Sequence, residues 1–137
     1  MMKVNEIAKK AEVTPEVVRY YLRIGLLKSD DKDANGYRRF SEHSLRRLNF
    51  IRRAKQLGFK LSELAEILRM AARRKTPCPM VRDIVKRRIE DNRVDLESLR
   101  ALQRRMERAL AQWHRMRNGV PDGHTVCRLI ESAEIHA

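Results

Sequence analysis

The chain has 137 residues, a formal net charge of +13 and 36% charged residues, which suits one small, well-solvated domain with an appendage. The excess of basic over acidic residues is seven in residues 1–70 and six in residues 71–137, so neither half is a basic tail on a neutral domain. A charge excess of this size favours a polyanionic partner, and no stretch reaches the roughly 20 apolar residues that a membrane-spanning helix needs.

The sequence carries neither an enzyme motif nor a secretion signal. It has no Ser/His/Asp set, no paired carboxylates and no Gly-rich phosphate loop, so we expect a protein that is not an enzyme. The first ten residues are charged and polar, unlike a signal peptide. We therefore expect a cytoplasmic protein in which the two cysteines, Cys78 and Cys127, are reduced thiols.

Residues 4–27 have the pattern of two short helices joined by a tight turn. Apolar residues recur at helical spacing from Val4 to Ala11. Thr14 and Pro15 have the residue types of an N-cap and a first helical position, and Gly25 closes the second helix. This order predicts a helix-turn-helix unit.

Residues 28–41 are expected to form a small two-stranded wing. Asn35-Gly36 is a strong hairpin signal, because a type I′ turn needs positive φ at both central positions. Three aspartates at positions 30, 31 and 33 precede the turn, and we expect them to be solvated rather than catalytic. The returning strand reads YRRF, which should direct its cations to one surface.

A second helical pair follows the wing. Ser41 has the residue type of an N-cap, and Leu45, Leu48, Phe50 and Ile51 form the expected core stripe of the first helix. Gly58-Phe59 interrupts this pattern, and a second helix is expected from Leu61 onward.

Residues 81–113 contain no Gly or Pro and carry one continuous apolar seam. Steps of four and three alternate along nine seam positions, of which seven are apolar, as in a coiled coil. The nine are Val85, Ile89, Asn92, Leu96, Leu99, Gln103, Met106, Leu110 and Trp113. A helix of about 33 residues spans roughly 50 Å, too long for the preceding residues to cover, so we expect dimerisation with a second copy.

With these elements identified, residues 1–70 resemble the MerR family of bacterial winged helix-turn-helix transcription regulators. The resemblance rests on VNEIAKKAEVTPEVVRYYLRIGLL and NGYRRFSEHSLRRLNFIRRAKQLGF. It implies a mainly α fold with a small β wing: a DNA-binding domain over residues 1–75, an antiparallel coiled-coil dimerisation helix over 76–117, and an effector-binding loop with a short terminal helix over 118–137. It further implies a homodimer that binds a palindromic operator in double-stranded promoter DNA and distorts it for RNA polymerase when an effector binds.

The expected DNA contacts lie on three elements. They are Thr14, Arg19, Tyr20, Tyr21 and Arg23 on the second helix, Tyr37, Arg38 and Arg39 on the wing by resemblance, and Arg52 and Lys55 on the next helix by resemblance. Arg19 is the best candidate for base contact, because a guanidinium pairs bidentately with guanine or phosphate. One of the two tyrosines is expected to pack in the core.

Metal-sensing members of the family have one cysteine at the start of the dimerisation helix and two around the loop at its end. By this resemblance Cys78 matches the first and Cys127 the last, while residues 117–118 stand near the middle position and are not soft-metal ligands. His124, or His114 as a substitute, could supply the third ligand. Cys78 of one subunit with His124 and Cys127 of the other would suit a thiophilic divalent ion such as Zn²⁺, Cd²⁺, Pb²⁺ or Hg²⁺.

Other hypotheses remain open at this point. The same DNA-binding dimer could respond to a small organic molecule or to thiol oxidation, because a cysteine before a helix is often only a small hydrophobe. An architectural or RNA-binding basic helical protein would share the charge, but it would not show the preference for one palindrome that a winged helix-turn-helix predicts.

Overall fold

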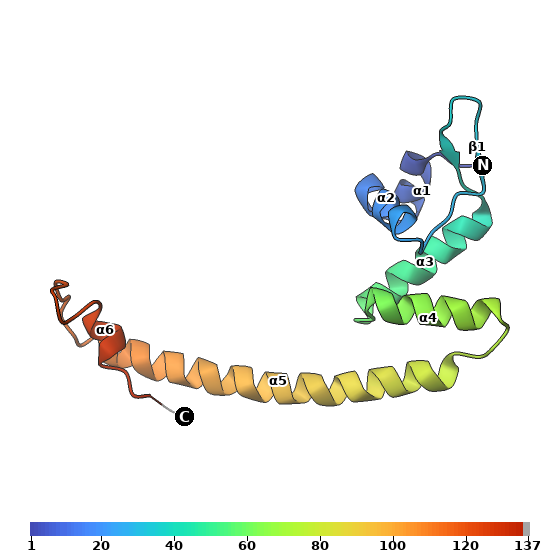
Figure 1. The fold of residues 1–137 in the computed structure, drawn as a ribbon. Helices are drawn as coiled ribbons and strands as arrows, with labels where there is room; N and C mark the ends of the chain where they lie inside the picture. Colours follow the sequence, from blue (N-terminus) through green and yellow to red (C-terminus); the bar gives the residue numbers. More distant parts are fainter. Residues whose placement is uncertain (136–137) are drawn as a thin grey trace. The chain divides into compact units, whose positions relative to one another are not determined.

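The computed structural model describes residues 1–135 and divides the chain into two compact units, Met1–Pro79 (the head unit) and Met80–Ala137 (the tail unit). The head unit contains α1 (Val4–Lys10), α2 (Pro15–Arg23), β1 (Asp31–Lys32), β2 (Arg38–Arg39), α3 (Glu42–Gln56) and α4 (Leu61–Ala72), and the chain continues through α5 (Cys78–Trp113) and α6 (Arg128–Glu131) (Figure 1). This order confirms a mainly helical fold with a small wing and a long helix. Within the described residues, no helix is long and apolar enough to cross a membrane.

The first two helices begin and end where the local sequence predicts. The Thr14 hydroxyl accepts the Val17 N–H at 3.2 Å, and Pro15 is the first residue of α2. After α2 the chain reverses at Gly25, whose φ of +81° is readily adopted only by glycine. α1 and α2 pack against one another as a helix-turn-helix pair.

The core of the head unit is formed by apolar side chains from α1 to α4 and from the residues that flank the wing. The largest fully buried ones are Phe40, Ile7, Leu27, Leu48, Ile51, Leu64 and Val18. Phe50 is 36% exposed, so its expected place in the core stripe of α3 is wrong. Each helical residue is rotated about 100° from the next, and Phe50 is therefore turned away from the buried face that carries Ile51.

The wing is a two-stranded antiparallel sheet in which Asp31 is opposite Arg39 and Lys32 is opposite Arg38. The expected type I′ turn is wrong, because among the turn residues only Gly36 has a positive φ, +79°. The Gly36 N–H donates to the Asp33 carbonyl at 2.9 Å, which is the pattern of a type I turn followed by a bulge. The sequence pattern also did not indicate that Met2 pairs with Phe40 through two backbone hydrogen bonds of 2.7 and 2.8 Å.

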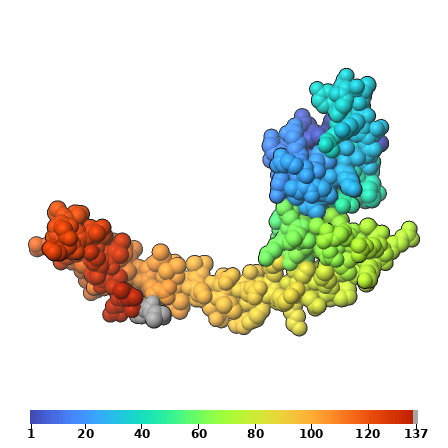
Figure 2. Space-filling view, viewed as in Figure 1, coloured from blue at the N-terminus to red at the C-terminus, as the bar shows by residue number. Residues whose placement is uncertain are grey.

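The tail unit consists of α5 from Met80 onward and the segment that follows it. Along the predicted seam of α5, the apolar side chains of Ile89, Leu96, Leu99, Met106 and Leu110 are each more than half exposed in the single chain. After Trp113 the chain turns, and α6 lies beside the C-terminal end of α5 (Figures 1 and 2). A Cβ added to Gly119 would lie 3.0 Å from the Arg128 Cβ, so glycine permits this close approach.

Candidate nucleic-acid interface and effector site

The two tyrosines of α2 lie in different environments. Tyr21 is buried beside Val18, whereas Tyr20 is 40% exposed, and their ring centroids are 6.0 Å apart. Burial raises the pKa of Tyr21, and the neighbouring Tyr20 raises it further. The Arg23 guanidinium carbon lies 5.5 Å from the centroid of the Tyr20 ring. Tyr21 is therefore the core tyrosine, and Tyr20 shares the outward face of α2 with Arg23.

A groove of about 710 Å³ separates α2 from the tip of the wing. Its lining residues are Lys3, Val4, Asn5, Arg19, Leu22, Arg23, Gly36, Tyr37 and Arg38. Four of them are basic and none is acidic, which makes the groove suitable for a polyanion backbone. Lys3 was not among the expected contacts, because nothing in its local sequence indicates that the N-terminus pairs with the wing.

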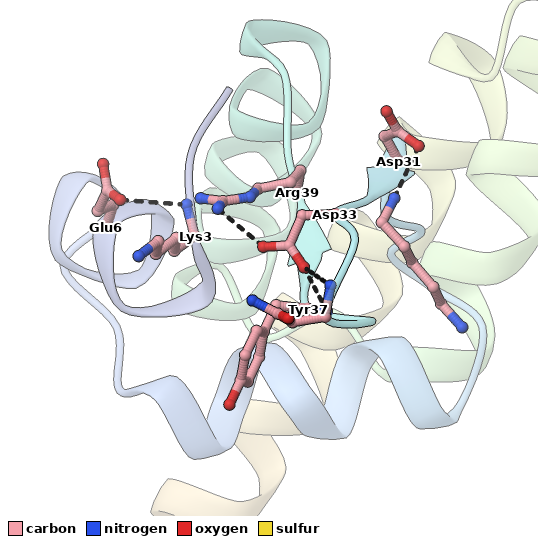
Figure 3. Close-up of polar contacts among 8 residues, drawn as sticks. Lys3, Glu6, Asp31, Asp33, Tyr37 and Arg39 are labelled. Atoms are coloured by element: carbon pink, nitrogen blue, oxygen red, sulfur yellow. Dashed lines mark hydrogen bonds and ion pairs between the residues drawn. The ribbon is translucent and has the colours of Figure 1, made fainter.

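Three of the expected DNA-contacting cations, Arg39, Arg52 and Lys55, have oxygen partners within 3.2 Å inside the head unit. Arg39 Nη2 is 2.8 Å from an Asp33 carboxylate oxygen (Figure 3). Arg52 Nη2 is 2.8 Å from Glu12 Oε2 on the turn between α1 and α2. The Glu12 side chain is 71% exposed and that of Arg52 36%, so solvent screens this ion pair and it contributes little to stability.

Lys55 is the third of these cations. Its ammonium group donates to the Phe59 carbonyl at 3.2 Å and so closes the C-terminal end of α3.

The remaining expected contacts, Thr14, Tyr37 and Arg38, are exposed. The structure thus brings Arg19, Arg23, Tyr37 and Arg38 together around one groove, while Arg52 and Lys55 lie outside its lining.

Of the three aspartates before the wing turn, Asp30 and Asp31 are exposed, as expected, and Asp33 is half-buried. Asp30 nevertheless helps to hold the wing in place. Asp30 Oδ2 accepts the Ser41 N–H at 2.8 Å and the Ser44 hydroxyl at 2.6 Å. The Arg47 Nε–H donates to the Leu26 carbonyl at 2.8 Å and fixes the segment before the wing on the same helix. Sequence reasoning missed these positioning residues, although Ser41-x-x-Ser44 beside an aspartate cluster is a usable signal.

Cys78 lies at the first residue of α5 with an exposed, free thiol. Its backbone N–H donates to the Thr76 hydroxyl at 3.3 Å, so Thr76 caps the start of the helix. Cys127 is half-buried, also free, and directly precedes α6. His114 is exposed and directly follows the last residue of α5.

The loop that contains His124 is organised by Asp122. Asp122 Oδ1 accepts the His124 N–H at 2.7 Å, the Thr125 N–H at 2.8 Å and the Thr125 hydroxyl at 2.9 Å. These hydrogen bonds, led by that of His124, hold the pKa of Asp122 below its ordinary value against a small rise from burial. The Val126 N–H donates to the Glu131 carboxylate at 3.2 Å. The loop is therefore an ordered element that fixes the backbone around His124 and Cys127.

The donor types fit a thiophilic metal ion, because thiolate and imidazole are the ligands that Zn²⁺ prefers. In the part of a single chain that the structure describes, no three His, Cys, Asp or Glu side chains form a metal-binding group. The expected set takes Cys78 from one subunit and His124 and Cys127 from the other, so a single chain is not expected to assemble it.

A second groove of about 700 Å³ lies in the tail unit between the end of α5 and the residues around α6. Its lining includes Met106, Leu110, Trp113 and Ile130, with Arg105 and Arg108 at the same site. An apolar concavity with a few charged groups is the usual form of an organic-ligand site. This groove keeps an organic effector open as an alternative to a metal ion.

Comparison with known proteins identifies the family. Residues 2–71 match the family described as MerR HTH family regulatory protein, and residues 45–111 match the one described as MerR, DNA binding. The HTH-type transcriptional regulator ZntR of Escherichia coli (strain K12) is 36% identical over 110 residues, which are 79% of this chain and 77% of that relative. The mercuric resistance operon regulatory protein of Bacillus cereus is 34% identical over 102 residues, 74% of this chain and 77% of that relative.

Solved structures agree with the sequence relatives. The crystal structure of the transcription regulator PbrR691 from Ralstonia metallidurans CH34 in complex with lead(II) matches with a TM-score of 0.74 at 29% identity. The match covers 96% of this chain and 98% of that chain. These relatives are transcription regulators rather than enzymes, and the chain belongs to the MerR family of DNA-binding transcriptional regulators.

Proposed function

We propose that this regulator acts as a homodimer on palindromic promoter DNA, together with RNA polymerase, and distorts that DNA when it binds a thiophilic divalent metal ion. The observation that carries the DNA-binding surface is the basic groove between α2 and the wing, which presents four cations and no carboxylate. An outward helix face beside such a groove can enter the major groove while the wing binds phosphate.

Within this surface, the contacts divide by chemistry. Arg19, on the exposed face of α2, reads base edges or phosphate, because its guanidinium is 3.9 Å from Glu16 and only loosely held. Tyr20 and Arg23 form the neighbouring surface, and Tyr37 and Arg38 bind phosphate from the wing. Thr14, Arg52 and Lys55 complete the expected DNA set at its edges. Tyr21 acts only by supporting α2 from the core.

The exposed seam of α5 supports the proposed homodimer. A helix of 36 residues with large aliphatic side chains exposed at regular spacing is stable when a second apolar surface covers it. Leu99 lies at the centre of the seam, with four seam positions on either side. Two antiparallel copies that cross there would place the Val85 end of one helix beside the Trp113 end of the other. This arrangement also brings the start of one α5 toward the loop that follows the other.

The metal ligands in this proposal are Cys78 of one subunit and His124 and Cys127 of the other, with His114 as a substitute for His124. The support is the donor chemistry, the free thiols and the Asp122-organised loop. One relative is a mercuric resistance operon regulator and one similar structure holds lead(II), which favours a thiophilic ion here as well. Zn²⁺, Cd²⁺, Pb²⁺ and Hg²⁺ are the candidates.

The test is a titration of reduced, metal-free protein with each of these four ions in competition with a chromophoric chelator. We expect submicromolar binding to wild type and strong losses in Cys78→Ser, Cys127→Ser and His124→Ala. His43→Ala is the matched control, because His43 is an exposed histidine in the head unit. A loss in His114→Ala without one in His124→Ala would assign the third ligand to His114. Submicromolar binding that survives Cys78→Ser would refute the metal site.

The alternative is the same DNA-binding dimer with an organic effector or thiol oxidation as its signal. The groove of about 700 Å³ beside Trp113 supports an organic effector, and the free state of both cysteines supports oxidation. Trp113 is the only tryptophan in the sequence, so quenching of its fluorescence reports occupation of that groove. Non-reducing gels after mild oxidation report an intersubunit disulfide.

A further inference from the structure

Arg39 differs from the two wing residues that precede it. Its Nη2 lies 2.8 Å from Asp33 Oδ2, and the two side chains are only 26% and 24% exposed. Tyr37 and Arg38 are instead exposed and line the basic groove. Successive side chains of a strand point to opposite faces, so Arg39 points away from the face that carries Arg38.

Asp33 joins three parts of the wing through one carboxylate. Its Oδ1 accepts the N–H groups of Asn35 and Tyr37, each at 3.0 Å, and its Oδ2 accepts Arg39. Figure 3 shows the Arg39 guanidinium and the Asp33 carboxylate directed at one another, with Asp33 also reaching the Tyr37 backbone. The Asp33 N–H donates to the Tyr37 carbonyl at 2.9 Å. Both backbone polar groups of Tyr37 are thus held by Asp33.

The carboxylate is ionised when it does this. Burial alone would raise the pKa of Asp33, but the hydrogen bonds from Tyr37, Asn35 and Arg39 outweigh burial and lower the pKa below its ordinary value. At neutral pH Asp33 therefore carries its full negative charge toward Arg39.

The wing needs such a fastening because its strands are very short. Each strand has two residues, and a two-stranded hairpin alone is marginal in water. The pairing of Met2 with Phe40 fixes the base of the returning strand, but it leaves the tip, where Tyr37 lies, to other contacts. Asp33 and Arg39 supply them.

We propose that Asp33 and Arg39 are a positioning pair that holds the wing in the conformation in which Tyr37 and Arg38 reach DNA phosphate, and that Arg39 does not itself bind DNA. This inference rests on the proposed DNA contact of the wing. Arg39 therefore leaves the expected set of DNA contacts and becomes a residue that acts by positioning Tyr37 and Arg38.

The experiment uses the 137-residue chain and the duplex that wild type enriches most from a random-sequence DNA library. Asp33→Asn is the informative variant, because the amide oxygen can still accept the Asn35 and Tyr37 N–H groups, while the NH2 group replaces the charged oxygen that accepts Arg39. Loss of a negative charge near DNA would by itself tighten binding. A positioning role predicts the opposite sign, a loss of affinity of about three- to fivefold.

Three further measurements separate positioning from contact. Arg39→Gln should weaken binding to the same extent, and the double variant should be no weaker than either single variant. The slope of log affinity against log salt should stay at the wild-type value in these variants, whereas Arg38→Gln should reduce it by about 0.9. When Tyr37→Ala and Arg38→Gln are already present, Asp33→Asn should have no further effect, which a general loss of fold stability would not produce.

Unchanged or tighter binding by Asp33→Asn, or a reduced salt slope in Arg39→Gln, would overturn the pair while leaving the proposed DNA surface intact. Thermal melting of each variant checks that it folds. If Asp33→Asn does not fold, Arg39→Gln and Arg39→Lys decide. Equal weakening of DNA binding by both variants, at an unchanged salt slope, supports positioning. Wild-type affinity in Arg39→Lys together with a reduced salt slope in Arg39→Gln overturns it. Failure of wild type to enrich any duplex would overturn both the pair and the proposed DNA surface.

Discussion

The Ser44 hydroxyl donates a hydrogen bond to the Asp30 carboxylate, with 2.6 Å between Oγ and Oδ2, although the two residues are 14 positions apart. The same Asp30 oxygen accepts the Ser41 N–H at 2.8 Å, so one side chain fastens the start of the wing to the first turn of α3. Ser44 is only 4% exposed. Without Asp30, its hydroxyl would keep only the longer contact of 3.3 Å with the Lys28 carbonyl.

Asp30→Ala should therefore lower the free energy of unfolding by about 1–2 kcal/mol at neutral pH, because a buried hydroxyl and a backbone N–H lose their acceptor. Urea unfolding at one fixed protein concentration measures this change. Asp31→Ala is the matched control, since Asp31 is an exposed neighbouring carboxylate, and it should change stability by less than about 0.5 kcal/mol. Equal losses of unfolding free energy in the two variants would show that the hydrogen bond between Ser44 and Asp30 does not stabilise the fold.

The same contact predicts a pH dependence. The Ser44 hydroxyl and then the Ser41 N–H hold the pKa of Asp30 below its ordinary value, and burial opposes them only in part. A depressed folded-state pKa means that the stabilisation is complete above the unfolded pKa and is lost as the pH falls through the folded pKa. The stability difference between wild type and Asp30→Ala should stay constant from neutral pH to about 5 and shrink below about pH 4. A difference that grows toward acid would contradict this assignment.

The two tyrosines of α2 should separate DNA binding from stability. Tyr20→Ala should weaken DNA binding about three- to tenfold, because Tyr20 lies on the proposed DNA surface. It should leave the free energy of unfolding within about 0.5 kcal/mol of wild type, because Tyr20 is exposed. Tyr21→Ala should instead cost about 3 kcal/mol of stability, since it empties a buried aromatic site. Fluorescence anisotropy with the selected duplex and urea unfolding measure the two effects. Exchange of the two outcomes would mean that α2 is rotated about its axis relative to this structure.

Features set by local chemistry could be predicted from the sequence. Thr14-Pro15 indicated the start of α2 and Ser41 the start of α3, because each cap acts within one turn of its own helix. The alternating four- and three-residue steps indicated α5 in the same way, since a helical seam depends only on local periodicity. The outward position of Arg19 followed from the same reasoning.

Features set by contacts between distant residues could not be predicted. The wing turn depends on Asp33, whose side chain accepts two backbone N–H groups and stabilises a bulge instead of the type I′ turn that Asn35-Gly36 alone suggests. Local sequence patterns indicate neither the pairing of Met2 with Phe40 nor the ion pair between Glu12 and Arg52. For the same reason Lys3 was not expected at the basic groove.

Leu99 lies at the centre of the seam and is 60% exposed in the single chain. Leu99→Lys should convert the proposed dimer to a monomer at micromolar concentration, because the proposed antiparallel arrangement would place two new ammonium groups close together in an apolar interface. Sedimentation equilibrium measures the association. Val94→Lys is the matched control, since Val94 is a 51% exposed aliphatic residue of the same helix outside the seam, and it should leave the dimer intact. Dissociation by both substitutions, or by neither, would refute the seam.

Asp122 should determine metal affinity without binding the metal. Its carboxylate fixes the backbone N–H of His124 and both donors of Thr125, and so holds the proposed imidazole ligand in a preformed loop. Asp122→Ala should weaken Zn²⁺ binding about tenfold, the usual effect of removing a group that orients a ligand. Asp122→Asn, which keeps an amide oxygen as acceptor, should lose less Zn²⁺ affinity.

The chelator-competition titration measures both variants, with Asp95→Ala on the exposed face of α5 as a carboxylate control. A loss as complete as that of Cys127→Ser would make Asp122 a direct ligand, and no loss in Asp122→Ala would mean that the loop around His124 does not form the metal site.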